Sequence, residues 1–93
     1  AAKVARARDV MHCDFAFYVG GTAENVEELP RLERLEGAAG IKVFIGSSTG
    51  NLLVDDEATL REVLKRIRRR AAFHCEDEAR LNARRGERVP GDP

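Results

Sequence analysis

The sequence lacks several features that would assign it directly to a functional class. It has no apolar run long enough to span a bilayer and no segment with the pattern of a signal peptide. Its 16 basic residues balance its 16 acidic residues, so no overall charge favours nucleic acid or an anionic membrane. Its two cysteines lack the spacing of a disulfide framework. We therefore expect a soluble protein in a reducing, cytoplasmic setting.

The chain has 93 residues, enough for one small domain, and 43% of them are hydrophobic. Three short apolar runs predict strands, at residues 15–19, 41–45 and 71–75. They are about thirty residues apart, a spacing that suits right-handed crossovers and a parallel sheet. The sequence therefore predicts an α/β fold with three parallel strands that alternate with helices. Three strands are too few to close a barrel.

Apolar residues at helical spacing predict helices around these strands. We expect the end of a helix at residues 1–11, a helix over 22–35 that Pro30 interrupts, a helix that begins after Asp55 or Asp56, and a polar helix over 79–86. The predicted apolar positions are Val4, Ala7, Met11, Val26, Leu29, Leu32, Leu35, Leu60, Val63, Leu64 and Ile67.

Lys42 is the residue that does not suit its surroundings. It lies inside the apolar run at 41–45, where a buried ammonium is costly unless it is paired or chemically changed. Two interpretations are open. The side chain either reaches an edge or a carboxylate, or burial lowers its pKa so that the free amine can react.

His74 follows Lys42 on the next predicted strand. If both strands run in the same direction, their carboxyl ends share one edge of the sheet, where α/β folds place active sites. Acidic residues at 76–78 could orient one ring nitrogen of His74. His74 could equally be an ordinary structural histidine.

Other segments invite weaker hypotheses. The pairs His12-Cys13 and His74-Cys75 together suggest a zinc site, but adjacent strand residues face opposite sides and no C-x2-C spacing is present. Residues 46–51 form a Gly/Ser loop without the Gly-Lys-Ser/Thr of a P-loop. The basic stretch 61–70 is either a nucleic-acid surface or, as we favour, the solvated face of an amphipathic helix.

Three runs together resemble the third, fourth and fifth strands of bacterial dihydroorotases, which belong to the amidohydrolase superfamily. The runs are DFAFYVGGT at 14–22, GIKVFIGSSTGNLLVDD at 40–56 and FHCEDE at 73–78. The resemblance extends over nearly the whole chain in the order and spacing of the family, and the middle run is the most specific. It implies a metal-dependent TIM barrel, of which residues 1–93 are an internal segment covering roughly strands three to five of eight.

The resemblance also implies a function and two site residues. Dihydroorotases interconvert N-carbamoyl-L-aspartate and L-dihydroorotate in pyrimidine biosynthesis. By resemblance, Lys42 is the carboxylated lysine that bridges two zinc ions, and His74 binds one of them. A carbamate on Lys42 would explain the lysine in an apolar strand, because it is an anionic oxygen donor. The partner would be the small-molecule substrate, with no nucleic acid and no membrane.

The chain lacks other residues that the family uses. The strand-one His-x-His pair, the substrate-binding arginine and asparagine, the strand-six histidine and the strand-eight aspartate base have no counterpart in residues 1–93. We therefore assign no catalytic residue, and we expect the isolated chain to be inactive. The alternatives are an inactive dihydroorotase-like remnant that binds a partner, or a related hydantoinase-type amidase. Exposed strand edges lead us to expect a homo-oligomer.

Overall fold

The computed structural model describes residues 2–46, 52–54, 56–87 and 89–91. Its elements, in chain order, are α1 (Ala2–Arg8), β1 (Phe17–Gly20), the 3-10 helix η1 (Ala23–Glu28), α2 (Leu29–Leu32), β2 (Ala38–Ile45), α3 (Glu57–Arg66), β3 (Ala71–Cys75), α4 (Glu78–Arg84) and the 3-10 helix η2 (Arg85–Glu87). In this part of the chain, no helix is both long and apolar enough to cross a membrane.

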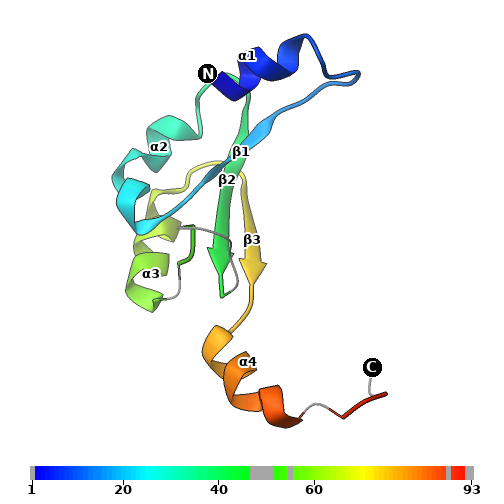
Figure 1. Cartoon of the computed structure of the whole chain (residues 1–93). Coiled ribbons are helices and arrows are strands. Elements are labelled where there is room, and N and C mark those ends of the chain that lie inside the picture. Colours follow the sequence, from blue (N-terminus) through cyan, green and yellow to red (C-terminus); the bar gives the residue numbers. More distant parts are fainter. Residues whose placement is uncertain (1, 47–51, 55, 88, 92–93) are drawn as a thin grey trace.

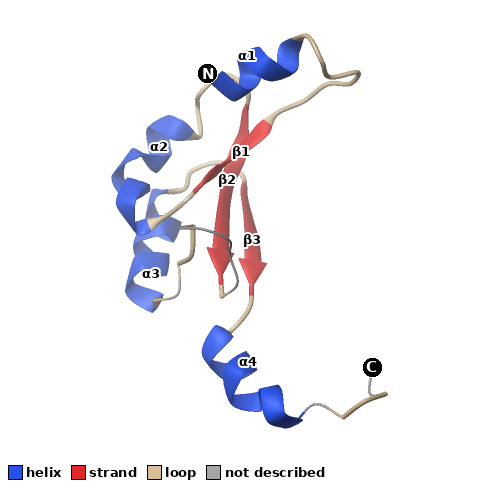
Figure 2. Cartoon of the chain, viewed as in Figure 1, coloured by secondary structure: helices blue, strands red, loops and turns tan. Residues whose placement is uncertain are grey.

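The three strands form one parallel sheet in the order β1-β2-β3, which confirms the predicted α/β class (Figures 1 and 2). Ile41 of β2 lies between Val19 and Ala71, and Phe44 lies beside His74. Beyond the end of β1, Leu53 takes the place of a strand next to Phe44, and the Val54 amide donates to the Phe44 carbonyl at 2.8 Å. The central strand is therefore paired on both sides along most of its length.

The core lies on one face of the sheet. Its fully or almost fully buried members are Leu29, Ile41, Val43, Val54 and Val63. The helices α2 and α3 lie on this side of the strands, whereas α1 lies near the amino ends of β1 and β2 and α4 beyond the carboxyl end of β3 (Figure 1). In the part of the chain that the structure describes, no helix covers the opposite face. Helix packing therefore divides the sheet into a covered and an uncovered face.

The strand bounds differ from prediction mainly in β2. The strand begins at Ala38 rather than Ile41, and β1 lies two residues later at its start than expected. The small residues at 38–40 give little strand signal. Gly40 has φ +157°, and a Cβ on it would lie 2.3 Å from the Arg70 carbonyl oxygen. Close backbone approach to the start of β3 therefore requires glycine at this position.

The expected helix over 22–35 is broken as predicted, but its buried face differs. The break falls between η1 and α2, with Pro30 in the first turn of α2, where its missing amide proton costs nothing. Leu29 is fully buried, whereas Leu35 is 42% exposed, which contradicts the predicted stripe. Glu33 is buried in its place. Because the helix ends at Leu32, Leu35 no longer continues its spacing.

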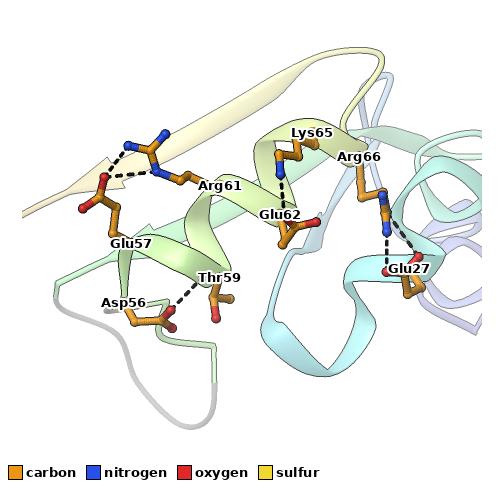
Figure 3. A network of polar contacts seen from close by, with 8 residues as sticks. All are labelled: Glu27, Asp56, Glu57, Thr59, Arg61, Glu62, Lys65 and Arg66. Atoms are coloured by element: carbon orange, nitrogen blue, oxygen red, sulfur yellow. Dashed lines mark hydrogen bonds and ion pairs between the residues drawn. The ribbon is translucent and has the colours of Figure 1, made fainter.

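Helix α3 begins where the sequence predicts. Asp56 is its N-cap and accepts a hydrogen bond from the Thr59 amide at 2.7 Å (Figure 3). Val63 is fully buried, but Leu64 is 49% exposed, so that part of the predicted stripe was wrong. Along the outer face, Arg61 pairs with Glu57, Lys65 with Glu62, and Arg66 with Glu27 of η1. The basic stretch at 61–66 is thus a solvated face with acidic neighbours.

The two ends of the chain follow the prediction only in part. Ala7 of α1 is buried and Val4 packs against Gly37, but Met11 lies beyond the helix and is 45% exposed. The polar helix near the end is α4 with η2. The predicted Gly/Ser loop lies outside the described residues except for Gly46.

Candidate functional site

Lys42 and His74 lie on the uncovered face of the sheet. Side chains alternate along a strand, so Ile41, Val43 and Ile45 turn to the helices and Lys42 and Phe44 turn away. His74 is the parallel neighbour of Phe44, and Ala72 that of Lys42, so His74 shares their face. The structure therefore brings the two predicted residues onto one face of adjacent strands, at the carboxyl half of each.

Lys42 is half-buried rather than fully buried. Its Nζ lies 4.9 Å from the centroid of the Phe44 ring, a distance typical of a cation–π contact. It takes part in none of the ion pairs of the described residues. Because its side chain is only half-buried, Lys42 does not carry the full cost of burying an ammonium, and no carboxylate pairs with it among the described residues. The run at 41–45 is a strand with one buried face, and Lys42 lies on the other face.

His74 is the next-to-last residue of β3, and its side chain is 40% exposed. Its ring centroid is 6.1 Å from that of Phe44, at an interplanar angle of 41°. Its Nε2 atom lies 2.9 Å from Oε1 of Glu76. One of the acidic residues that follow His74 therefore contacts a ring nitrogen, as the sequence suggested.

The loop that follows β2 also approaches this face. A Cβ on Gly20, which is the register neighbour of Lys42, would lie 3.0 Å from a methyl carbon of Leu52. The loop that joins β2 to α3 thus returns beside the strand that carries Lys42. The Gly/Ser residues themselves lie outside the described part of the chain.

The cavities lie near this edge of the sheet but on other surfaces. A hollow of about 710 Å³ is lined by Ile45, Leu60, Asp56 and Glu76, among others, on the helix side of the strand ends. A second, of about 510 Å³, lies between the end of β3 and α4. Neither is lined by Lys42 or His74. Both are open surface hollows.

The four-residue zinc site is not formed. His12 and Cys13 lie in the segment between α1 and β1, whereas His74 and Cys75 are the last two residues of β3. Both cysteines are free and exposed. Within the described ranges, no group of three or more His, Cys, Asp or Glu side chains is placed to hold a metal ion. The structure therefore does not bring these two dipeptides together.

Lys42 and His74 alone do not make a metal site. They share one face, and Oε1 of Glu76 lies 2.9 Å from Nε2 of His74. A carboxylated Lys42 would supply oxygen donors beside it. Because zinc sites use at least three protein ligands, these two residues would need further donors from outside the described segment.

Sequence reasoning missed one buried charged residue, Glu33. It is 1% exposed, and its carboxylate accepts hydrogen bonds from the Arg68 and Arg69 amides at 3.1 and 3.0 Å. The Arg69 guanidinium also donates to the Glu33 carbonyl at 3.2 Å. Glu33 thus fixes the loop that leads into β3. The only sequence feature that indicated its burial was its spacing of four residues from Leu29, which places the two on one side of a helix.

Comparisons with protein-family models, curated proteins and solved structures gave no match to this chain. The class that the fold defines is therefore an α/β protein with a three-stranded parallel sheet, helices on one face and a lysine–histidine pair on the other.

Proposed function

We propose that this chain is an internal segment of a dihydroorotase-like amidohydrolase barrel. Its substrate would be a small cyclic amide, L-dihydroorotate, or its open form N-carbamoyl-L-aspartate. Lys42, as the carboxylated lysine, and His74 would be two of the ligands to a pair of zinc ions. The general base and the other ligands would come from parts of the barrel beyond these residues.

One observation carries this proposal: Lys42 and His74 share the uncovered face of a parallel sheet. In a TIM barrel the helices form the outer ring, and the opposite side chains of the strands point into the barrel. The three described strands have this arrangement, with Ile41 and Val43 toward the helices and Lys42 away from them. Both polar residues also lie toward the carboxyl ends of their strands, where barrel active sites are found.

The chemistry of the two side chains agrees with such a site. Lys42 takes part in no ion pair among the described residues. Once its ammonium has lost a proton, the amine would add to carbon dioxide and release a second proton, which leaves a carbamate. The product would be an anionic oxygen ligand, which replaces a positive charge beside Phe44. When bound, zinc would supply Lewis-acid polarisation of the amide carbonyl. The role of this segment would be to hold Lys42 and His74 in place.

The test compares the full-length protein that carries this segment with two variants, Lys42→Ala and His74→Ala. We expect zinc content and dihydroorotate hydrolysis to fall to background in both. Lys65→Ala is the matched control, because Lys65 is an exposed lysine paired with Glu62 on α3. It should keep both properties. Native mass spectrometry should show the added mass of one carbon dioxide in the wild type and in Lys65→Ala only.

Two results would contradict the proposal. Full zinc occupancy in Lys42→Ala would show that Lys42 is not a zinc ligand. Partner binding without zinc or hydrolysis in the wild type would favour a non-catalytic binding module. Unpaired outer edges on β1 and β3 in the described segment would suit that alternative.

A further inference from the structure

We propose that four arginines in the connections that lead into β2 and β3 form a docking surface for a short acidic segment of a partner protein. The members of this arginine surface are Arg34, Arg68, Arg69 and Arg70. Arg34 lies between α2 and β2, directly after Glu33, and the other three lie between α3 and β3. The surface shares no residue with the proposed zinc site.

Hydrogen bonds hold the two connections together. The buried carboxylate of Glu33 accepts from the amides of Arg68 and Arg69 at 3.1 and 3.0 Å. Nη1 of Arg69 donates to the Glu33 carbonyl at 3.2 Å. The Arg70 carbonyl accepts from the Ile41 amide at 2.9 Å, which ties the second connection to β2. The fold therefore fixes the backbone of the arginine surface, so a ligand would not have to order these connections on binding.

The guanidinium groups of this surface have no acidic partner in the described part of the chain. All four arginines are exposed, and none takes part in an ion pair there. Glu33 contacts backbone amides, and its charge offsets only one of the four. On α3, in contrast, each basic residue pairs with a glutamate, namely Arg61, Lys65 and Arg66. The basic stretch 61–70 thus divides into a compensated helix and a connection with net positive charge.

The charge pattern around the surface favours a short acidic segment over a nucleic acid. A guanidinium donates paired hydrogen bonds to a carboxylate or to a phosphate, so the arginines alone do not choose between them. Arg31, the one basic residue of α2, pairs with Glu28, as those of α3 pair with their own partners. A long phosphate backbone would therefore find no further uncompensated cation along α2 or α3. The chain also has 16 basic and 16 acidic residues, whereas nucleic-acid-binding domains are typically basic.

The arginine surface and the proposed zinc site lie toward opposite ends of β3. Arg70 directly precedes the first residue of the strand, and His74 is the next-to-last residue. The connection from α3 enters β3 at the end opposite the arrowhead (Figure 1). A partner on the arginine surface would therefore leave the carboxyl end of β3 open. Binding at this surface and zinc chemistry can be measured separately, and either can fail without the other.

The test measures binding of a fluorescein-labelled hexaglutamate peptide to the full-length protein that carries this segment, by fluorescence anisotropy at low salt. The test variant combines Arg34→Gln, Arg68→Gln and Arg70→Gln, and it keeps Arg69 because this side chain also bonds to Glu33. We expect the affinity to fall about tenfold, since three exposed ion pairs of typical strength together contribute about that much. High salt should abolish binding to the wild type.

The matched control removes the same charge from the compensated helix, by combining Arg61→Gln, Lys65→Gln and Arg66→Gln. Its affinity for the peptide should change less than about twofold, because these side chains already have glutamate partners. Equal losses in the two variants would show that net charge, not the arginine surface, attracts the peptide, and would overturn the proposal. Failure of the wild type to bind the peptide at low salt would also overturn it.

Two additions keep the result decisive. The single variants Arg68→Gln and Arg70→Gln should each lose part of the affinity, which covers the case in which the triple variant does not fold. A short duplex DNA of mixed sequence tests the other class of partner. Tighter binding of this DNA than of the peptide, with loss in the same variants, would overturn the acidic segment in favour of a phosphate backbone.

Discussion

The two faces of β2 have different surroundings, although their residues alternate within a single strand. Ile41 and Val43 are completely buried against the helices, and they hold the fold together. Lys42 and Phe44, one position along, are only half-buried and contact each other across the uncovered face. The comparison teaches that the charged residue in an apolar run need not be strained. It lies on the face that no described helix covers, where its side chain is only half-buried.

The largest expected effect comes from truncating Ile41 on the covered face, and it is compared with truncation of its neighbour Lys42 on the uncovered face. Ile41→Ala removes a side chain with no exposed surface and should lower the free energy of unfolding by about 2–5 kcal/mol. Lys42→Ala should cost about 1 kcal/mol or less, since it removes a cation–π contact at a half-exposed position. Urea denaturation of the two purified variants measures both. Equal losses would mean that the faces do not differ as the structure shows.

The α/β class and the parallel order could be predicted because they depend on local signals. Apolar runs, glycines and spacing mark β2 and β3, and β3 was predicted at its observed bounds. Residues whose role depends on tertiary contact could not be found in this way. The sequence cannot show that Leu35 leaves the core or that Glu33 enters it, because both follow from the end of a four-residue helix.

The site was predictable to a similar degree. The positions of Lys42 and His74 on one face follow from strand alternation once the register is known. The register itself is not written in the sequence, because Gly40 and Gly46 fix it through contacts with residues thirty positions away. Likewise, three consecutive acidic residues at 76–78 look equivalent until the structure gives each its own partner.

The second prediction tests the only charged residue that is buried on the covered side among the described residues. Glu33→Ala should lower the free energy of unfolding by about 1–3 kcal/mol, because it leaves the Arg68 and Arg69 amides without their acceptor. Glu36→Ala is the control. Its side chain is 87% exposed, and its loss should change stability by less than about 0.5 kcal/mol. Thermal unfolding followed by circular dichroism distinguishes them, and equal midpoints would contradict the role of Glu33.

The smallest expected effect concerns Asp56, the N-cap of α3, which is one of the helices that pack on the covered face. Hydrogen bonds from the side chain and the amide of Thr59 lower the pKa of Asp56 below its ordinary value of 3.8 (Figure 3). A lowered folded-state pKa means that the ionised carboxylate stabilises the fold above the unfolded-state pKa. That contribution is lost as the pH falls through the folded-state pKa.

Asp56→Asn separates the charge of this cap from its hydrogen bond, since asparagine also caps helices well. At neutral pH, the wild type should be slightly more stable, because the carboxylate lies at the positive end of the α3 dipole. The difference should disappear once the pH is below the folded-state pKa of Asp56. Urea midpoints of both proteins from neutral to acidic pH measure it. A difference that persists in acid would show that the hydrogen bond, and not the charge, distinguishes the two side chains at the edge of the covered face.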